Sequence, residues 1–293
     1  MASVSLKPPP RGELIDIGGR RLHAVRAGPR PTSGALVLLE AGAFGFSADW
    51  SVVQAKLAAL GLASLAYDRA GLGLSDPGPK PRDGLAVVHD LETMLAKLGE
   101  TGPLILCGHS MAGLHVHLFA ARNPSRVAGI VLVDATTPEA MDSKLVSAFV
   151  GQFGGAARLV AWGAGVGLFK PLAGTGLADQ IGLTGAVGEE KRWAFADRDH
   201  NAWAAEEVAH WPAAASQARS AGALDPAWPV AVVLAGPADS RNALKALQMA
   251  PARAAGHGSI EHVAGATHAT VLGGLYADAI VRGIEFVRSA AHA

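Results

Sequence analysis

The sequence predicts an α/β fold in which a mostly parallel, doubly wound sheet carries an inserted helical cap. Short runs rich in Val, Leu and Ala alternate with longer amphipathic segments. Several short runs are apolar throughout, which is typical of strands buried on both faces. One interval, residues 138–225, breaks the alternation with Gly-, Ala- and Trp-rich sequence. Alternating strands and helices imply parallel pairing, with helices covering both faces of the sheet.

The individual elements follow from local patterns. GELIDI and RRLHAV flank Gly18 and Gly19 and predict an N-terminal β-hairpin. Further strands are expected at residues 35–40, 62–68, 103–108, 129–134, 229–236 and 259–265. Helices are expected at residues 47–60, 85–99, 110–123 and from near His268 to the C-terminus.

The division into domains follows from the interval that breaks the pattern. A loop as long as residues 138–225 without secondary structure is rare in a compact domain. We therefore expect a mainly helical cap there, on a core formed by residues 1–137 and 226–293.

Composition excludes several classes of protein. Half of the 293 residues are hydrophobic and 17% are charged, so a sizeable core can form. Lys+Arg and Asp+Glu are both 25, and this balance argues against nucleic-acid binding. The single cysteine, Cys107, allows no internal disulfide. The N-terminus lacks the apolar stretch of a secretory signal, and the apolar run at 159–169 is shorter than the roughly 20 residues of a bilayer span. We expect a cytoplasmic monomer or homodimer without stable membrane insertion.

Ser110 lies between a buried strand and an amphipathic helix in the segment PLILCGHSMAGLHVHLFAAR. The Gly-x-Ser pattern suits a sharp turn, because a side chain at Gly108 would collide with neighbouring backbone. The turn lifts the hydroxyl out of the sheet, and the following helix directs its N-terminus toward developing negative charge. The sequence predicts Ser110 as a nucleophile and the backbone N–H of Met111 as an oxyanion donor.

A serine hydroxyl is a weak nucleophile at neutral pH and needs a base. Among the 11 histidines, His268 is the one that follows a late strand and is expected to open the terminal helix. A carboxylate must orient its imidazole, and two aspartates stand at strand ends. Asp239, after the strand at 229–236, is favoured, and Asp134 stays open as the alternative.

The loop after the strand at 35–40 is expected to give the second oxyanion donor. Glycines at 42 and 45 let its backbone approach a substrate, which points to the N–H of Ala43, with Phe44 as the nearby alternative. We also expect an apolar pocket beneath the cap. Its candidate residues are Phe44, Trp162, Leu168 and Phe169.

With the order Ser, Asp, His, the sequence resembles the α/β-hydrolase superfamily over nearly its whole length, and most closely its capped esterase and lipase-like branch. GHSMAG matches the nucleophile elbow at Ser110, and GATHA matches the histidine loop at His268. YDRAGLGLSD (67–76) resembles the family's Asp-Arg-x-Gly-x-Gly-x-Ser segment beside the elbow.

The sequence departs from the family pattern at two places. Glu40-Ala41-Gly42 stands where many members have His-Gly, so Ala43 is a positional inference. Ala112 replaces the usual second elbow glycine. The family places its acid after either of two strands, and the resemblance therefore leaves both aspartates open.

The residues and the resemblance together predict a serine hydrolase that cleaves small to medium hydrophobic carboxylic esters through an acyl-enzyme. Neither a metal nor an organic cofactor is expected; His115 and His117, two apart on a helix, face different directions. The alternatives are a lactonase, thioesterase, amidase or carbon–carbon bond hydrolase, or a ligand-binding protein without catalysis. Epoxide and haloalkane cleavage is disfavoured, because relatives with those activities carry a carboxylate where Ser110 stands. The cap could also act as a membrane-surface or dimerisation element.

Overall fold

One eight-stranded sheet forms the centre of the computed structural model, which describes residues 7–29, 34–239 and 243–291. The strand order is β1-β2-β4-β3-β5-β6-β7-β8. The strands are β1 (Glu13–Asp16), β2 (Arg21–Ala27), β3 (Leu36–Glu40), β4 (Ser64–Tyr67), β5 (Leu104–His109), β6 (Val127–Val133), β7 (Val230–Ala235) and β8 (Gly258–Val263). β1 pairs antiparallel with β2, and β2 with β4, whereas the remaining pairs are parallel. The predicted hairpin and mostly parallel sheet are confirmed.

Helices connect the strands in the order expected for a doubly wound sheet. The α-helices are α1 (Ser51–Ala59), α2 (Gly84–Lys97), α3 (Ala112–Arg122), α4 (Lys144–Gly165), α5 (Gly185–Ala196), α6 (Arg198–Ala209), α7 (Trp211–Ser220), α8 (Ala243–Ala254) and α9 (Ala277–Ala290). The short 3₁₀ helices are η1 (Ser47–Trp50), η2 (Pro124–Arg126), η3 (Pro138–Asp142), η4 (Lys170–Leu172) and η5 (Thr270–Leu272).

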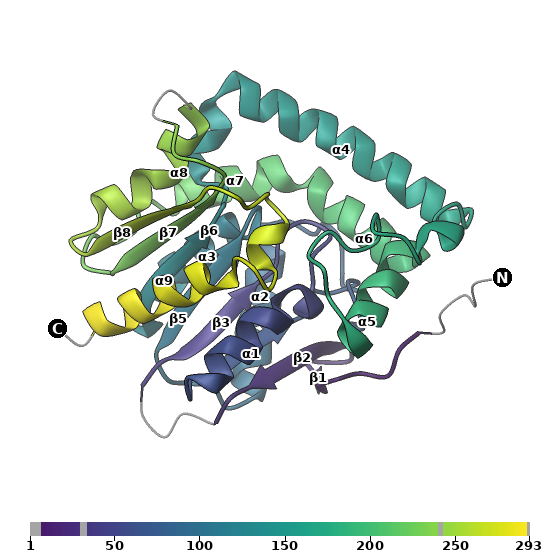
Figure 1. Cartoon of the computed structure of the whole chain (residues 1–293), viewed down its shortest axis with the longest axis horizontal. Helices are drawn as coiled ribbons and strands as arrows, with labels where there is room; N and C mark the ends of the chain where they lie inside the picture. The colour runs from purple at the N-terminus through teal and green to yellow at the C-terminus, as the bar shows by residue number, and fades with distance from the viewer. Residues whose placement is uncertain (1–6, 30–33, 240–242, 292–293) are drawn as a thin grey trace.

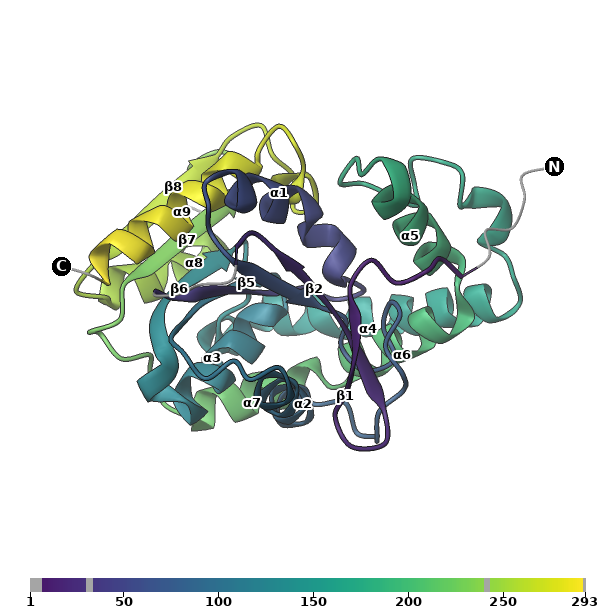
Figure 2. The ribbon, with the colours of Figure 1, turned by 90° about the horizontal axis from the view of Figure 1, so that it is seen from below.

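The apolar strands are buried on both faces because helices cover both. In β3, Leu36 and Leu38 face one core and Val37 and Leu39 face the other. α1 and α9 pack on the second of these faces, and α2, α3 and α8 pack on the first. Figure 2 shows α1 and α9 above the sheet and α2, α3 and α7 below it. This arrangement leaves the carboxyl ends of the parallel strands free to carry a site.

The interval that we predicted as a cap, between β6 and β7, contains η3, α4, η4, α5, α6 and α7. α4 lies along the outer edge of the molecule and packs on α6 and η3 (Figure 1). α7 instead packs on α2 and α3 of the core. On the inner side of α4, the Phe153 ring meets Trp211 edge-on, with 6.0 Å between ring centroids.

The terminal helix begins later than predicted. His268 lies in the loop between β8 and α9, next to the short helix η5, and does not open α9. Two consecutive glycines, Gly273 and Gly274, separate η5 from α9. Glycine is a poor helix former, and this pair explains why the helix starts only at Ala277.

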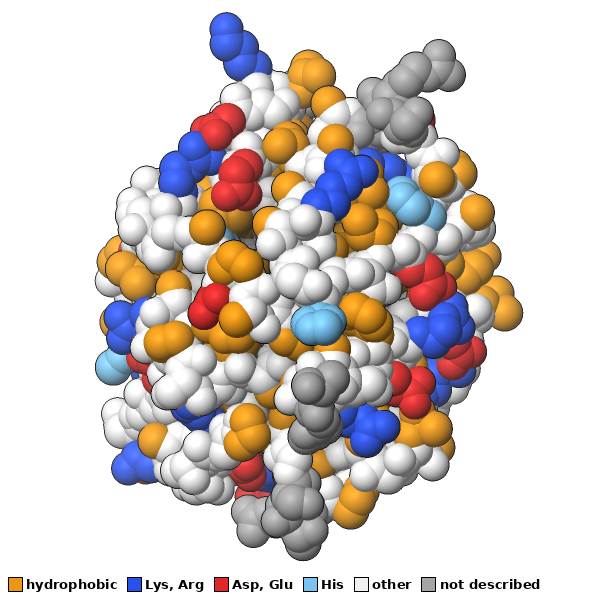
Figure 3. All heavy atoms as spheres, turned by 90° about the vertical axis from the view of Figure 1, so that its left-hand side faces the viewer, with side chains coloured by type: hydrophobic (Ala, Val, Ile, Leu, Met, Phe, Trp, Pro, Cys, Tyr) orange, Lys and Arg blue, Asp and Glu red, His pale blue; other side chains and the backbone are white. Residues whose placement is uncertain are grey.

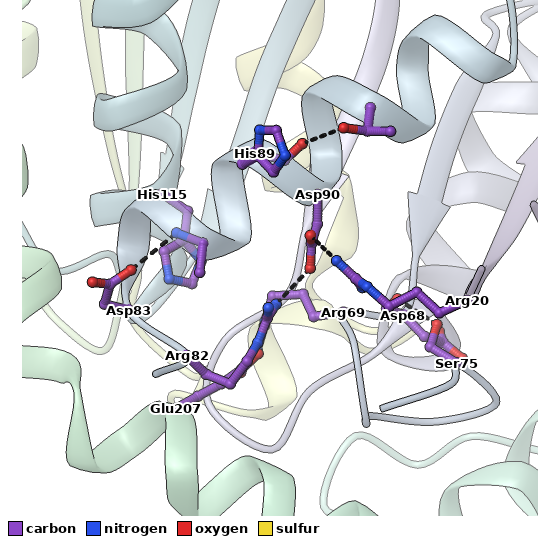
Figure 4. Close-up of polar contacts among 12 residues, drawn as sticks. Arg20, Asp68, Arg69, Ser75, Arg82, Asp83, His89, Asp90, His115 and Glu207 are labelled. Carbon is purple, nitrogen blue, oxygen red and sulfur yellow. Dashed lines mark hydrogen bonds and ion pairs between the residues drawn. The ribbon is translucent and has the colours of Figure 1, made fainter. Parts of the chain in front are cut away.

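Ionic contacts fasten the N-terminal hairpin to the core. Arg20, in the turn between β1 and β2, and Arg82, before α2, converge on the carboxylate of Asp90 (Figure 4). Arg82 and Asp90 are buried. Elsewhere the surface is mixed: on the face shown in Figure 3, basic and acidic side chains are interspersed among apolar ones.

Candidate active site

Ser110 stands in a strained turn between β5 and α3. Its φ is 57°, in the left-handed region that non-glycine residues rarely adopt. The turn requires a glycine before it, because a Cβ on Gly108 would lie 2.7 Å from Val116 Cγ2 and 3.0 Å from the Ala112 carbonyl oxygen. Neighbouring backbone holds the turn: the Ser110 N–H donates to the Val133 carbonyl at 3.1 Å, and its carbonyl accepts from Thr136 at 2.9 Å.

Left-handed backbone gathers around this turn. Among the described residues, the non-glycine residues with positive φ are Phe44 (58°), Ser110 (57°) and Asp134 (43°). They follow β3, β5 and β6, three neighbouring parallel strands. Each such conformation costs of the order of 1–3 kcal/mol, so strain of this kind persists where surrounding structure enforces it, often at functional sites.

His268 is paired with Asp134, the alternative of the two aspartates that we predicted. Its Nδ1 lies 2.6 Å from Asp134 Oδ2. Burial would raise the pKa of Asp134, but the hydrogen bond and charge of His268 outweigh burial and lower that pKa. Asp239, which sequence analysis favoured, is exposed beyond the end of β7. The preference for Asp239 is therefore corrected: β6 lies next to the nucleophile strand, and its end reaches the imidazole.

The residue before the nucleophile holds the histidine loop. His109 Nε2 donates to the backbone carbonyl oxygen of His268 at 2.9 Å, and the two rings lie 4.6 Å apart between centroids. Burial and the neighbouring charge of His268 lower the pKa of His109 to about 3. His109 is therefore neutral at physiological pH, so its Nε2 carries one proton and can donate it to this carbonyl.

The loop after β3, residues 41–46, lies against the nucleophile, and we call it the oxyanion loop. A Cβ on Gly42 would come within 2.9 Å of Ser110 Cβ, so only glycine permits this approach. The N–H groups of Met111 and Ala43 donate no hydrogen bond to any of the described residues. Both N–H groups are therefore without a partner among the described residues, and their role as oxyanion donors stays a prediction.

A buried ionic cluster fixes the oxyanion loop. Arg69, from the YDRAGLGLSD segment, donates to the carbonyl oxygens of Ala41 and of Gly42, the latter at 2.8 Å. The same guanidinium contacts Glu40 at 2.8 Å and Glu207 of α6 at 2.9 Å. Figure 4 shows Arg69 and Glu207 within this polar region.

Opposite charges in this cluster keep Glu40 and Arg69 ionised despite their burial. Burial would raise the pKa of Glu40, but His115 and Arg69 outweigh it and hold the pKa below its ordinary value. Burial would also lower the pKa of Arg69, and Glu207 and Glu40 raise it instead. Glu40, which departs from the family pattern, therefore serves as a buried counter-ion of Arg69.

A cavity of about 460 Å³ opens over Ser110 and His268. This volume suits a small to medium ligand. The Ser110 hydroxyl and the His268 ring both line the cavity without being hydrogen-bonded to each other. Catalytic hydrogen bonds of this kind commonly tighten only when substrate binds.

The cavity wall differs from the predicted pocket. Phe44 lines it, whereas Trp162, Leu168 and Phe169 do not. Trp162 and Leu168 point to solvent, and Phe169 packs on Phe195 with ring centroids 5.4 Å apart. The structure therefore does not place these three candidates in the cavity wall: two are exposed, and the third packs behind Phe195, which does line the cavity.

Two aromatic residues that are not among the predicted pocket residues, Phe149 and Phe153, form part of the wall. Phe149 and Phe153 of α4 stack with centroids 6.1 Å apart, and Phe153 also meets Phe44 edge-on. Their i, i+4 spacing is the signal that could have revealed one helix face. A polar pair, Asp49 and Lys191 at 2.6 Å, also lines the cavity.

Other reactive groups lie outside the site or have a structural role. Within the described ranges, no group of three His, Cys, Asp or Glu side chains is arranged to hold a metal ion. Cys107 is buried in β5, and burial raises the pKa of its thiol, so it is not a nucleophile at neutral pH.

The chain has the α/β-hydrolase fold, and its candidate site lies where that fold carries one. Residues 35–169 match the family model described as alpha/beta hydrolase fold. A putative epoxide hydrolase from Pseudomonas aeruginosa is similar at a TM-score of 0.74 and 19% identity, over 98% of this chain and 99% of that one. The enol-lactonase from Burkholderia xenovorans LB400 is similar at a TM-score of 0.63 and 21% identity, over 92% of this chain and 96% of that one.

Curated relatives match a shorter segment. A probable transporter, efuK, of Hormonema carpetanum is 36% identical over 133 residues, which is 42% of this chain and 18% of that protein. The matches span between 13% and 40% of the length of the curated relatives. These similarities confirm the predicted fold, and the esterase and lipase-like branch stays a prediction.

Proposed function

We propose that this protein is a serine hydrolase that cleaves carboxylic esters of small to medium hydrophobic substrates through an acyl-enzyme. The observation that carries this proposal is the convergence of a strained Ser110 and the Asp134–His268 pair at one end of the sheet. The mainly apolar cavity above them supports a hydrophobic substrate.

In the proposed reaction, Ser110 Oγ attacks the ester carbonyl carbon while His268 Nε2 takes the hydroxyl proton. The C=O electron pair moves to oxygen, and the N–H groups of Met111 and Ala43 stabilise the resulting oxyanion. Asp134 accepts the hydrogen bond from His268 Nδ1 and stabilises the imidazolium.

The intermediate then collapses, the C–O bond to the alcohol breaks, and His268 returns its proton to the leaving oxygen. Water, deprotonated by the same imidazole, attacks the acyl-serine in a second addition. Collapse of that intermediate breaks the bond to Ser110 Oγ, which takes the proton back from His268, and releases the carboxylic acid.

The serine at the elbow distinguishes this proposal from epoxide or haloalkane cleavage, although proteins described with those activities share the fold. A lactone is an internal ester, so the same residues could open one, and the enol-lactonase neighbour makes lactones a necessary part of any substrate panel.

The test is a panel of p-nitrophenyl esters, lactones and amides, assayed with wild type, Ser110→Ala and a control, Ser216→Ala, on the exposed surface of α7. We expect ester turnover to fall by about 10³-fold or more in Ser110→Ala and to be unchanged in the control. Labelling by a fluorophosphonate probe should disappear in the same variant. Ester turnover that survives Ser110→Ala, or its absence from wild type, would reject the proposal.

A further inference from the structure

An exposed apolar face runs along α4. The exposed fractions are 84% for Leu145, 71% for Leu159 and 66% for Trp162. Leu145 and Phe149, four positions apart, lie on the same side of the helix, and Leu159 continues that side. The opposite side, with Val150, Ala157 and Ala164, is buried. In Figure 1, α4 lies outermost in the molecule.

The charges on this part of the chain have one sign. Residues 143–178, which we call the cap segment, contain Lys144, Arg158 and Lys170 but no Asp or Glu. The carboxylates that adjoin its two ends already have partners: Asp142 pairs with Arg219, and Asp179 accepts backbone N–H groups of residues 181–183. All three cations are exposed. The whole chain, by contrast, has a formal net charge of zero. Within the cap segment, the apolar face is therefore bordered by positive charge alone.

We propose that the cap segment docks on the surface of a membrane that contains anionic lipids. An amphipathic helix with cations and an aromatic residue beside its apolar face lies in the plane of such an interface. Exposed Trp residues favour the boundary between lipid and water, and Trp162 faces solvent beside this face. Each Lys or Arg near an anionic surface adds attraction.

The packing of α4 against the rest of the protein favours a helix that lies along the membrane surface over one that crosses the bilayer. Among the described residues, α4 is the helix whose 22-residue length and composition would allow it to cross a bilayer. A crossing would expose its inner side, which packs on α6, and would bring Arg158 into the apolar layer. A helix that lies along the membrane surface keeps its packing on α6 and leaves Arg158 in contact with water or lipid headgroups.

A second copy of the chain fits this face less well. Two such faces in contact would bring cations of like sign together, and the carboxylates nearest to them in the chain, Asp142 and Asp179, lie at the two ends of the segment and have partners of their own. Like charges opposed at an interface are unfavourable, whereas phosphate groups of anionic lipids complement them.

The face is continuous with the mouth of the cavity. Phe149 and Leu177 line the cavity, yet 59% and 62% of their surfaces are exposed. Docking would therefore bring the cavity opening next to the lipid, where hydrophobic substrates partition. The docking proposal goes beyond the proposed ester chemistry and does not depend on it, because vesicle binding can be measured without any turnover.

The test is co-sedimentation of the full chain with vesicles of phosphatidylcholine alone or of phosphatidylcholine with phosphatidylglycerol. We expect binding to the anionic vesicles to require at least about tenfold less lipid than binding to the neutral ones. The Leu145→Glu/Leu159→Glu variant should lose this binding, and Lys144→Gln/Arg158→Gln/Lys170→Gln should lose the preference for anionic lipid.

The matched control is Leu60→Glu/Leu85→Glu, two exposed leucines outside the cap segment, which should bind vesicles as wild type does. Thermal unfolding of all variants checks that substitutions at exposed positions leave the fold intact. Absence of wild-type binding, equal binding to both vesicles, or equal binding by the cap variant overturns the proposal. Dimerisation in sedimentation that is lost in Leu145→Glu/Leu159→Glu, without vesicle binding, assigns the face to a second copy instead.

Discussion

The imidazole of His268 donates a hydrogen bond from Nδ1 to one carboxylate oxygen of Asp134, 2.6 Å away. This contact fixes which ring nitrogen carries the proton and leaves Nε2 free to act on Ser110. Asp134 itself adopts a φ of 43°, a conformation that aspartate tolerates better than most side chains. The backbone turn at the end of β6 and the carboxylate of Asp134 therefore both serve to orient the His268 imidazole.

Substitution at the two candidate aspartates separates their roles. We expect Asp134→Asn to lower kcat by about 10⁴-fold, because the amide donates where the carboxylate accepts and selects the wrong tautomer. Asp239→Asn should change kcat by less than threefold, roughly the scatter of neutral surface changes. Steady-state assays on the best p-nitrophenyl ester make the comparison, and a larger loss from Asp239→Asn would reverse the assignment.

His109 is expected to be a positioning residue for the base. Its bond to the His268 carbonyl should be lost in His109→Leu, and we expect kcat to fall by about tenfold with little change in KM, because the imidazole is less well aimed. His109→Gln, whose amide N–H can reach the same carbonyl, should recover most of the loss. If both variants match wild type in kcat, the loop does not depend on this bond.

At the scale of elements, α6 connects the cap to the oxyanion loop. Glu207 of α6 contacts Arg69, and Arg69 holds the carbonyl oxygens of Ala41 and Gly42. His200, near the start of the same helix, accepts the N–H of Gly73 at 3.0 Å. One helix thus bonds twice to the loop that follows β4, and Arg69 of that loop holds the oxyanion loop, so displacement of α6 would disturb the loop that faces the substrate.

Adjacent glutamates on α6 provide a matched test. Glu207→Gln leaves the buried guanidinium with one less counter-charge, and we expect the free energy of unfolding to fall by about 1–3 kcal/mol. Glu206→Gln removes a pair with the exposed Lys80 and should cost less than about 1 kcal/mol. Urea unfolding followed by tryptophan fluorescence compares them; similar losses in the two variants would contradict the buried cluster's role.

The elements differ in how far the sequence predicts them. Strands and the nucleophile turn follow from local chemistry: apolar runs are buried, and Gly108 precedes a residue with positive φ. The choice of acid does not, because Asp134 and Asp239 follow neighbouring strands, β6 and β7, and only the path of the loop after β8 brings His268 to Asp134. Similarly, the Gly-rich, apolar composition of α4 does not reveal which side faces the cavity, so it does not distinguish Phe153, which lines the cavity, from Trp162, which is exposed.

For the molecule as a whole, folding has to keep several titratable groups away from water. His200 is buried, and burial together with the charge of Lys191 lowers its pKa to about 3. The pKa of His109 is lowered to about 3 as well. Their ordinary pKa is 6.5, so the unfolded chain binds protons that the folded protein excludes. Stability should therefore be full above about pH 6.5 and decline as the pH falls toward 3.

The contribution of His200 can be isolated with His200→Asn, whose amide oxygen can still accept the Gly73 N–H. Between pH 7.5 and 5.0, linkage predicts that the excluded proton costs wild type about 2 kcal/mol of unfolding free energy at this one site. The variant has no proton to exclude there, so its stability should fall by about 2 kcal/mol less over the same range, even if it starts lower at pH 7.5. His257→Asn, at an exposed position, should keep the wild-type dependence. Parallel pH dependence in wild type and His200→Asn would mean that His200 is protonated in the folded protein, contrary to its burial between the cap and the sheet.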